Sequence, residues 1–167
     1  MKTKKLVLMA LLAAVSLGIW IAEAQLPPLV PVPGVKLGLA NIVTLAAMAL
    51  LGRRAAGGVL AVRVMLGSLF AGSFSAVLFS LAGGGLAWAV MALTIGRFEE
   101  KQLWIVSVLG ALGHNAGQLL AAVAVTRTPS LLWYGPALAA AAVVTGAFTG
   151  AAAVYLVRAV GPLVRKM

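Results

Sequence analysis

The sequence predicts an all-α integral membrane protein with about six transmembrane helices in one domain, residues 1–167. Of its residues, 63% are hydrophobic and only 10% are charged, whereas about 25% are charged in a typical soluble domain. The mean hydropathy is +1.10. The apolar runs are long and rich in Ala, Leu and Val, without the strict alternation that marks a membrane β-barrel. A soluble catalytic domain does not fit in what remains.

Six apolar segments can be drawn along the chain. We expect helices at residues 6–25, 36–51, 55–71, 74–96, 103–125 and 134–157. The second and third segments are short, which leaves open whether they cross the bilayer fully. Residues 26–34 between the first two contain four prolines, which prevent a regular helix and favour a stiff, extended loop. Because this loop is apolar, we expect it to pack over the protein or to dip into the membrane interface.

The basic residues indicate the orientation, because Lys and Arg accumulate in cytoplasmic loops. With a cytoplasmic N-terminus, ten of the 13 basic residues fall inside, Lys36 and Arg127 fall outside, and Arg63 lies in the membrane. The ten are Lys2, Lys4, Lys5, Arg53, Arg54, Arg97, Lys101, Arg158, Arg165 and Lys166. We therefore expect a multi-pass protein of the cell membrane with both termini cytoplasmic. The net charge of +10 is then explained by topology and by anionic headgroups, not by nucleic acid.

The N-terminal segment has two interpretations. Basic residues precede its apolar run, and residues 22–24 (AEA) resemble a signal-peptide cleavage site. The run is longer than the usual apolar region of a signal peptide, and Trp20 near its end suits an anchor at the membrane interface. We expect a retained helix, with a cleaved signal peptide as the alternative.

Arg63 is the most informative single residue. It lies eight residues into the apolar segment 55–70, which places its guanidinium roughly 12 Å deep in the bilayer. An arginine at that depth costs about 3 kcal/mol or more, so it usually faces a polar cavity or a partner. We predict that Arg63 binds a ligand.

A second polar cluster lies at residues 110–118 (GALGHNAGQ), in the middle of the fifth segment. His114 and Gln118 share a helix face at spacing i,i+4, and Asn115 and Gln118 are i,i+3 neighbours. Three glycines around them allow another helix or a ligand to approach the backbone. These side chains could simply hold helices together, at about 0.6 kcal/mol each. Together with Arg63, they favour a polar binding cavity instead.

Asn41 joins this set as a supporting contact from the outer half of the second segment, whereas Arg63 and the cluster around His114 lie near the membrane centre. Glu23 and Lys36 lie at the outer ends of their segments. For Glu23 we leave open a pocket role or pairing with a base or water, and for Lys36 an interface anchor or a ligand contact. The depths describe a cavity that opens to the outside. Its cations and neutral donors suit a small ligand with an anionic or strongly polar head.

Small residues form a stripe on the first segment, where Ala10, Ala14 and Gly18 recur at four-residue spacing. Such a stripe permits close packing of another helix, either within the protein or from a partner. The chain contains no cysteine, no aspartate and no ATP-binding glycine-rich motif. We expect no enzymatic activity and no resident cofactor or metal, and any ATP-driven uptake would need a partner's ATPase.

Four motifs carry a resemblance to a known family. Residues 31–45 (PVPGVKLGLANIVTL), 63–69 (RVMLGSL), 79–84 (FSLAGG) and 113–118 (GHNAGQ) resemble, in this order, the Gx transporter family, also labelled heptaprenyl diphosphate synthase component I. The resemblance covers residues 6–155. This family is similar to the substrate-binding S-components of energy-coupling-factor transporters, which are six-helix proteins that capture a vitamin-like substrate from outside.

The resemblance implies a docking role for Ala10 and Ala14, a transmembrane coupling protein with two ATPases as partner, and an outward ligand pocket. The other family label implies prenyl diphosphate synthesis, which uses Mg²⁺ held by clustered carboxylates. Without aspartate, this chain does not fit a catalytic subunit. The alternative function is therefore a non-catalytic membrane subunit for isoprenoid, quinone or redox-cofactor assembly. In a third interpretation the chain is a purely structural scaffold.

Overall fold

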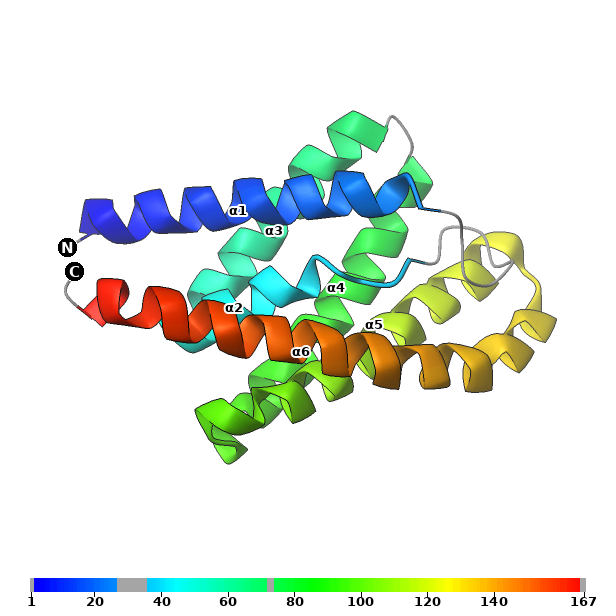
Figure 1. The fold of residues 1–167 in the computed structure, drawn as a ribbon. Helices are drawn as coiled ribbons and strands as arrows, with labels where there is room; N and C mark the ends of the chain where they lie inside the picture. The colour runs from blue at the N-terminus through cyan, green and yellow to red at the C-terminus, as the bar shows by residue number, and fades with distance from the viewer. Residues whose placement is uncertain (1, 27–35, 72–73, 166–167) are drawn as a thin grey trace.

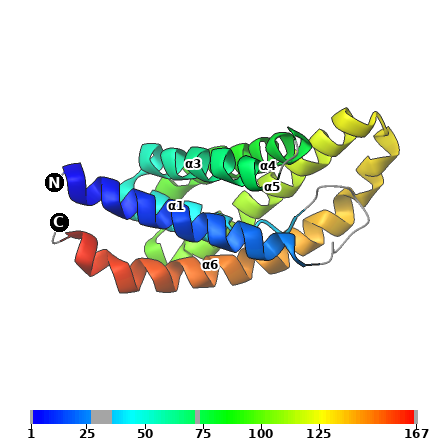
Figure 2. The same cartoon turned by 90° about the horizontal axis from the view of Figure 1, so that it is seen from above.

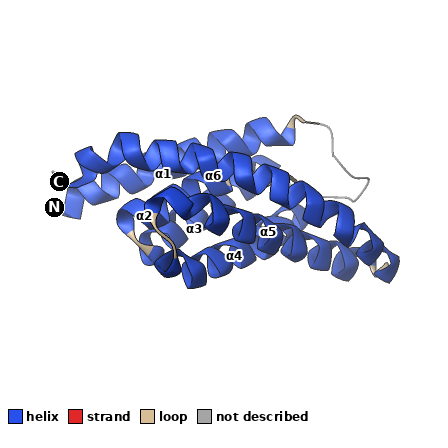
Figure 3. Cartoon of the chain, turned by 60° about the horizontal axis from the view of Figure 1, so that its bottom comes forward, coloured by secondary structure: helices blue, strands red, loops and turns tan. Residues whose placement is uncertain are grey.

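The computed structural model describes residues 2–26, 36–71 and 74–165, and in this part of the chain it is helical with no strand (Figures 1 and 3). Its elements are α1 (Lys2–Ala24), α2 (Asn41–Leu51), α3 (Arg53–Ala71), α4 (Phe74–Thr94), η1 (Ile95–Arg97), η2 (Glu100–Gln102), α5 (Leu103–Thr126), η3 (Pro129–Tyr134) and α6 (Gly135–Arg165). The six α-helices confirm the all-α prediction.

Four segments are long and apolar enough to cross a membrane, namely Thr3–Ala24, Phe74–Arg97, Glu100–Thr126 and Pro129–Val164. A chain with four such helices is a multi-pass membrane protein. α3 has 19 residues and carries three arginines, and it is not among the four. The first, fourth, fifth and sixth predicted segments are confirmed as helices of spanning length.

For the second predicted segment, which the sequence left open as a full or a partial span, the structure shows a helix too short to cross the bilayer. α2 begins at Asn41 rather than at residue 36 and has 11 residues, a length of about 16 Å against a hydrocarbon core of about 30 Å. Seven of these residues are buried. α2 is therefore a short central helix surrounded by other helices, and its apolar residues contact protein instead of lipid.

The two termini lie together at one end of the bundle (Figures 1 and 2). The basic connections lie at this end too, since Arg53 and Glu100 line one depression and Arg158 contacts Glu100 at 3.6 Å. The α5–α6 connection lies at the opposite end (Figure 1), which we call the outer end. This separation agrees with the orientation expected from the basic residues.

Small residues bring α5 close to its neighbours α4 and α6, against which it packs most extensively. A Cβ atom on Gly117 would collide with the carbonyl oxygen of Ala82, and one on Gly150 would collide with the Cα of Trp104. The glycines near His114 therefore admit a neighbouring helix. The proline-rich loop predicted at residues 26–34 lies outside the described residues, apart from Leu26, which is exposed.

Candidate functional site: a closed polar cavity at the outer end

The segment before α2, residues 36–40, is fixed by side chains from two distant helices, and we call it the covering segment. Glu23 at the end of α1 accepts hydrogen bonds from the backbone N–H groups of Gly38 at 2.6 Å and Leu39 at 3.1 Å. Gln118 of α5 accepts one from the N–H of Lys36 at 2.9 Å. These bonds give the non-helical segment partners for its backbone, which explains why α2 begins only at Asn41.

Gly38 allows the covering segment to lie close to α5. Its φ of +78° is in the left-handed region, and a Cβ atom there would come within 2.7 Å of the His114 ring. Gly83 of α4 has the same role on the other side, because a Cβ there would approach Gln118 and His114 within 3.0 Å. Both glycines are therefore required by the close packing around His114.

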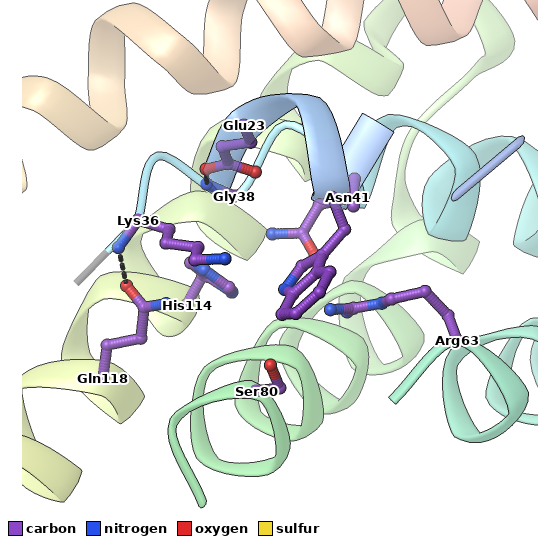
Figure 4. A pocket seen from close by; sticks show the side chains of 10 residues that line it. Glu23, Lys36, Gly38, Asn41, Arg63, Ser80, His114 and Gln118 are labelled. Carbon is purple, nitrogen blue, oxygen red and sulfur yellow. Dashed lines mark hydrogen bonds between the residues drawn. The ribbon is translucent and has the colours of Figure 1, made fainter. Parts of the chain in front are cut away.

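The covering segment closes a small cavity of about 10 Å³, which is room for about one water molecule. Its lining comes from α1 through α5 and consists of Trp20, Glu23, Lys36, Gly38, Ala40, Asn41, Arg63, Ser80, His114 and Gln118. Figure 4 shows the polar side chains converging from these separate helices. The structure thus brings together four of the five predicted ligand-binding residues, Asn41, Arg63, His114 and Gln118.

Asn115 does not belong to this lining. It is buried, but its Nδ2 donates a hydrogen bond to the carbonyl oxygen of Leu138 in α6 at 2.8 Å. It follows His114 by one residue, a turn of about 100° around the helix, and so faces a different neighbour. The geometry assigns Asn115 to helix packing, whereas the i,i+4 pair His114 and Gln118 does share one face.

Arg63 lies deep inside the protein with only 2% of its surface exposed. Within the described residues its Nε and Nη2 atoms have no hydrogen-bond partner, and no salt bridge reaches it. The Nδ2 of Asn41 and the Nε2 of His114 are likewise unpartnered in the described part. Buried polar groups without partners are rare, and each requires an explanation such as a ligand or a bound water molecule. The same holds for Ser16 Oγ, Thr44 Oγ1 and Asn115 Oδ1, which lie outside the cavity lining.

Lys36 and Trp20 form the edge of the cavity. The Lys36 Nζ lies 3.9 Å from the centre of the Trp20 ring, a favourable cation–π geometry. Burial lowers the pKa of Lys36, and the nearby Glu23 carboxylate opposes this change. The expectation that Trp20 anchors the protein at the membrane interface is wrong, because only 7% of it is exposed and it faces the cavity.

Six lining residues are not among the predicted ligand-binding residues: Trp20, Glu23, Lys36, Gly38, Ala40 and Ser80. For Glu23 and Lys36, the sequence left a pocket role open. Glu23 had the clearest signal, as the one carboxylate within a predicted span. Ser80 lies in the motif at residues 79–84, but it has neither a charge nor a spacing to other polar residues that would indicate a role in the cavity. Tryptophan is common both at membrane interfaces and in protein cores, so the residue type of Trp20 does not by itself predict its location.

The stripe on α1 points away from the bundle. Ala10, Ala14 and Gly18 are exposed, and a Cβ added to Gly18 would meet no atom within 4 Å. Leu11 and Val15 beside them are 60% and 46% exposed. Of the two interpretations of the stripe, packing inside this chain is therefore wrong.

The fold and the cavity define a polytopic helical membrane protein with a closed polar site near its outer end. The model of the heptaprenyl diphosphate synthase component I family matches residues 12–156, and the chain belongs to that family. Searches of curated proteins and of solved structures found no match.

Proposed function

We propose that this protein is the substrate-capture subunit of an energy-coupling-factor-type uptake transporter for a small polar or anionic-headed metabolite. The observation that carries the proposal is the closed cavity, in which side chains from five successive helices meet while buried Arg63 has two unpartnered nitrogens. Helix packing leaves these Arg63 atoms without partners, whereas a bound ligand would satisfy them.

The covering segment supports a capture function. It holds the cavity closed through two side chains, Glu23 and Gln118, and a few backbone hydrogen bonds. Each such bond contributes about 0.5–1.5 kcal/mol net, and bonds to a charged group about 1.5–3. A segment fixed this weakly can open for a ligand and close over it again.

The exposed stripe on α1 supports a protein partner in the membrane. Ala10, Ala14 and Gly18 let another helix approach the backbone, which is how helices associate in lipid. The partner in this proposal is a transmembrane coupling protein with its ATPases, because the chain has no nucleotide-binding motif.

The test is a mild-detergent pull-down of the tagged protein from its native membranes, followed by protein mass spectrometry. We expect a coupling membrane protein and paired ATPases, and we expect Ala10→Leu/Ala14→Leu to lose them. A matched control is Ala151→Leu, which adds the same side chain at an exposed position on α6. Recovery of no ATPase with the wild-type chain contradicts the transporter proposal.

A second candidate is a non-catalytic subunit of isoprenoid or quinone assembly, and one surface favours it. At the end with the termini, two adjoining depressions have apolar walls that include Leu50 and Val157. Arg53 lines one depression and Arg158 the other, while Glu100 lines both and forms an ion pair with Arg158. An apolar wall beside cations suits an amphiphile with a phosphate head. Recovery of a prenyl synthase or redox subunits in the same pull-down, without ATPases, selects this candidate.

A further inference from the structure

The polar atoms of the cavity divide into two sets. Three acceptor atoms are already engaged, because both carboxylate oxygens of Glu23 and the Oε1 of Gln118 receive hydrogen bonds from the covering segment. Three donor atoms are not, since the Nε and Nη2 of Arg63 and the Nδ2 of Asn41 are buried without partners among the described residues. A ligand that brings acceptor oxygens would satisfy these donors.

The two unpartnered nitrogens of Arg63 belong to the same edge of the guanidinium. The N–H groups of Nε and Nη2 are parallel and match the two oxygens of a carboxylate or phosphate, which they bind in bidentate fashion. A single carbonyl or hydroxyl oxygen would satisfy only one of them. The arginine thus presents a geometry specific for an oxyanion.

The charge of the lining distinguishes between oxyanions. The charged side chains are two cations, Arg63 and Lys36, and one carboxylate, Glu23, which leaves one positive charge in excess. A carboxylate ligand neutralises it. A phosphate monoester carries a charge of about −1.5 to −2 and would leave a negative charge in a site shielded from water, which is costly.

We propose that the cavity recognises its ligand by a single carboxylate group, held by the guanidinium of Arg63 with Asn41 Nδ2 as a further donor. This inference rests on the proposed capture function and names the class of its substrate, a small carboxylic acid. The closed cavity accommodates about one water molecule, so the ligand enters when the covering segment moves. Small carboxylates are therefore suitable probes.

The test uses the full chain alone in lipid nanodiscs and observes trifluoroacetate by fluorine NMR, with neutral trifluoroethanol as the reference probe. We expect saturable broadening of the trifluoroacetate signal that acetate reverses and inorganic phosphate does not. Arg63→Gln and Arg63→Lys should each weaken binding by at least about tenfold. The lysine variant keeps the charge but loses the parallel N–H pair.

The matched control is Arg127→Gln, which removes a basic residue between α5 and η3 at the outer end and should bind as the wild type does. Asn41→Leu provides a second variant that leaves the buried charge in place, and circular dichroism verifies that each variant is folded. The inference is overturned if phosphate displaces trifluoroacetate and acetate does not. It is also overturned if Arg63→Lys binds trifluoroacetate as tightly as the wild type does. Neither result affects the capture proposal, because that depends on recovery of ATPases in the pull-down.

Discussion

The buried polar side chains on the two faces of α5 differ in their hydrogen bonding. Toward α6, the Ser107 and Thr149 hydroxyls share a hydrogen bond of 2.9 Å, and Asn115 donates to Leu138 at 2.8 Å. Toward the cavity, the Nε2 of His114 is buried without a partner in the described part of the chain. The same helix therefore carries one face whose side chains bond across to α6, where only the Oδ1 of Asn115 lacks a partner among the described residues, and another face that lines the cavity.

The comparison shows that burial of a polar residue does not by itself indicate its role. A buried group with a partner contributes modestly to stability, whereas one without a partner lowers stability and persists where function requires it. The α6 side should therefore respond to substitution through stability, and the cavity side should respond through binding.

Arg63→Met should have the largest effect. It removes two charge-assisted hydrogen bonds to the ligand, so binding of trifluoroacetate should weaken by at least about 100-fold. The free energy of unfolding should stay the same or rise by about 1–4 kcal/mol, because an apolar side chain replaces a buried unpaired charge. Denaturant titration of the ligand-free protein measures the second quantity. A less stable variant that still binds would support the structural-scaffold interpretation instead.

Gly150→Ala should lower stability by about 1–3 kcal/mol without changing the affinity for trifluoroacetate. The added Cβ would collide with the backbone of Trp104, and overpacking between helices has a cost of this size. Gly85→Ala is the matched control, since its Cβ would meet no atom within 4 Å. Equal stabilities of the two variants would mean that α5 and α6 do not pack as closely as described.

Glu23→Gln should loosen the covering segment. The amide keeps one acceptor oxygen but loses the negative charge, so one backbone N–H of Gly38 or Leu39 loses its partner. We expect amide hydrogen exchange at these two residues to accelerate by about tenfold, equivalent to about 1.4 kcal/mol. Glu99→Gln at the opposite end should leave their exchange unchanged, and unchanged exchange in Glu23→Gln would show that Glu23 does not hold the segment.

Thr149→Val should have the smallest effect, a loss of about 0.6 kcal/mol, which is the average for a hydrogen bond between helices in a membrane protein. A double-mutant cycle with Ser107→Ala isolates the interaction. A coupling energy near zero would remove the hydroxyl pair from the interactions that hold α5 to α6.

Much of the site could be predicted from sequence because it depends on depth. Arg63 and the pair His114–Gln118 are expected near the centre of their segments and Asn41 in the outer half of its own, so a compact bundle can bring them to one cavity. Asn115 could not be separated from His114 in this way, because the position of α6 decides which face of α5 meets which neighbour. The residue at which α2 begins could not be predicted from the sequence either. It depends on a contact between distant segments, in which Glu23 binds the backbone of residues 38 and 39.

The most direct measurement is native mass spectrometry of the wild type and of Arg63→Met, each purified gently from native membranes with no added ligand. We expect the wild type to carry a small molecule with a carboxylate group, and the folded variant to be recovered without it. Two results would contradict carboxylate recognition by Arg63. One is the same bound molecule on both proteins, and the other is a wild type that carries only a neutral or cationic molecule.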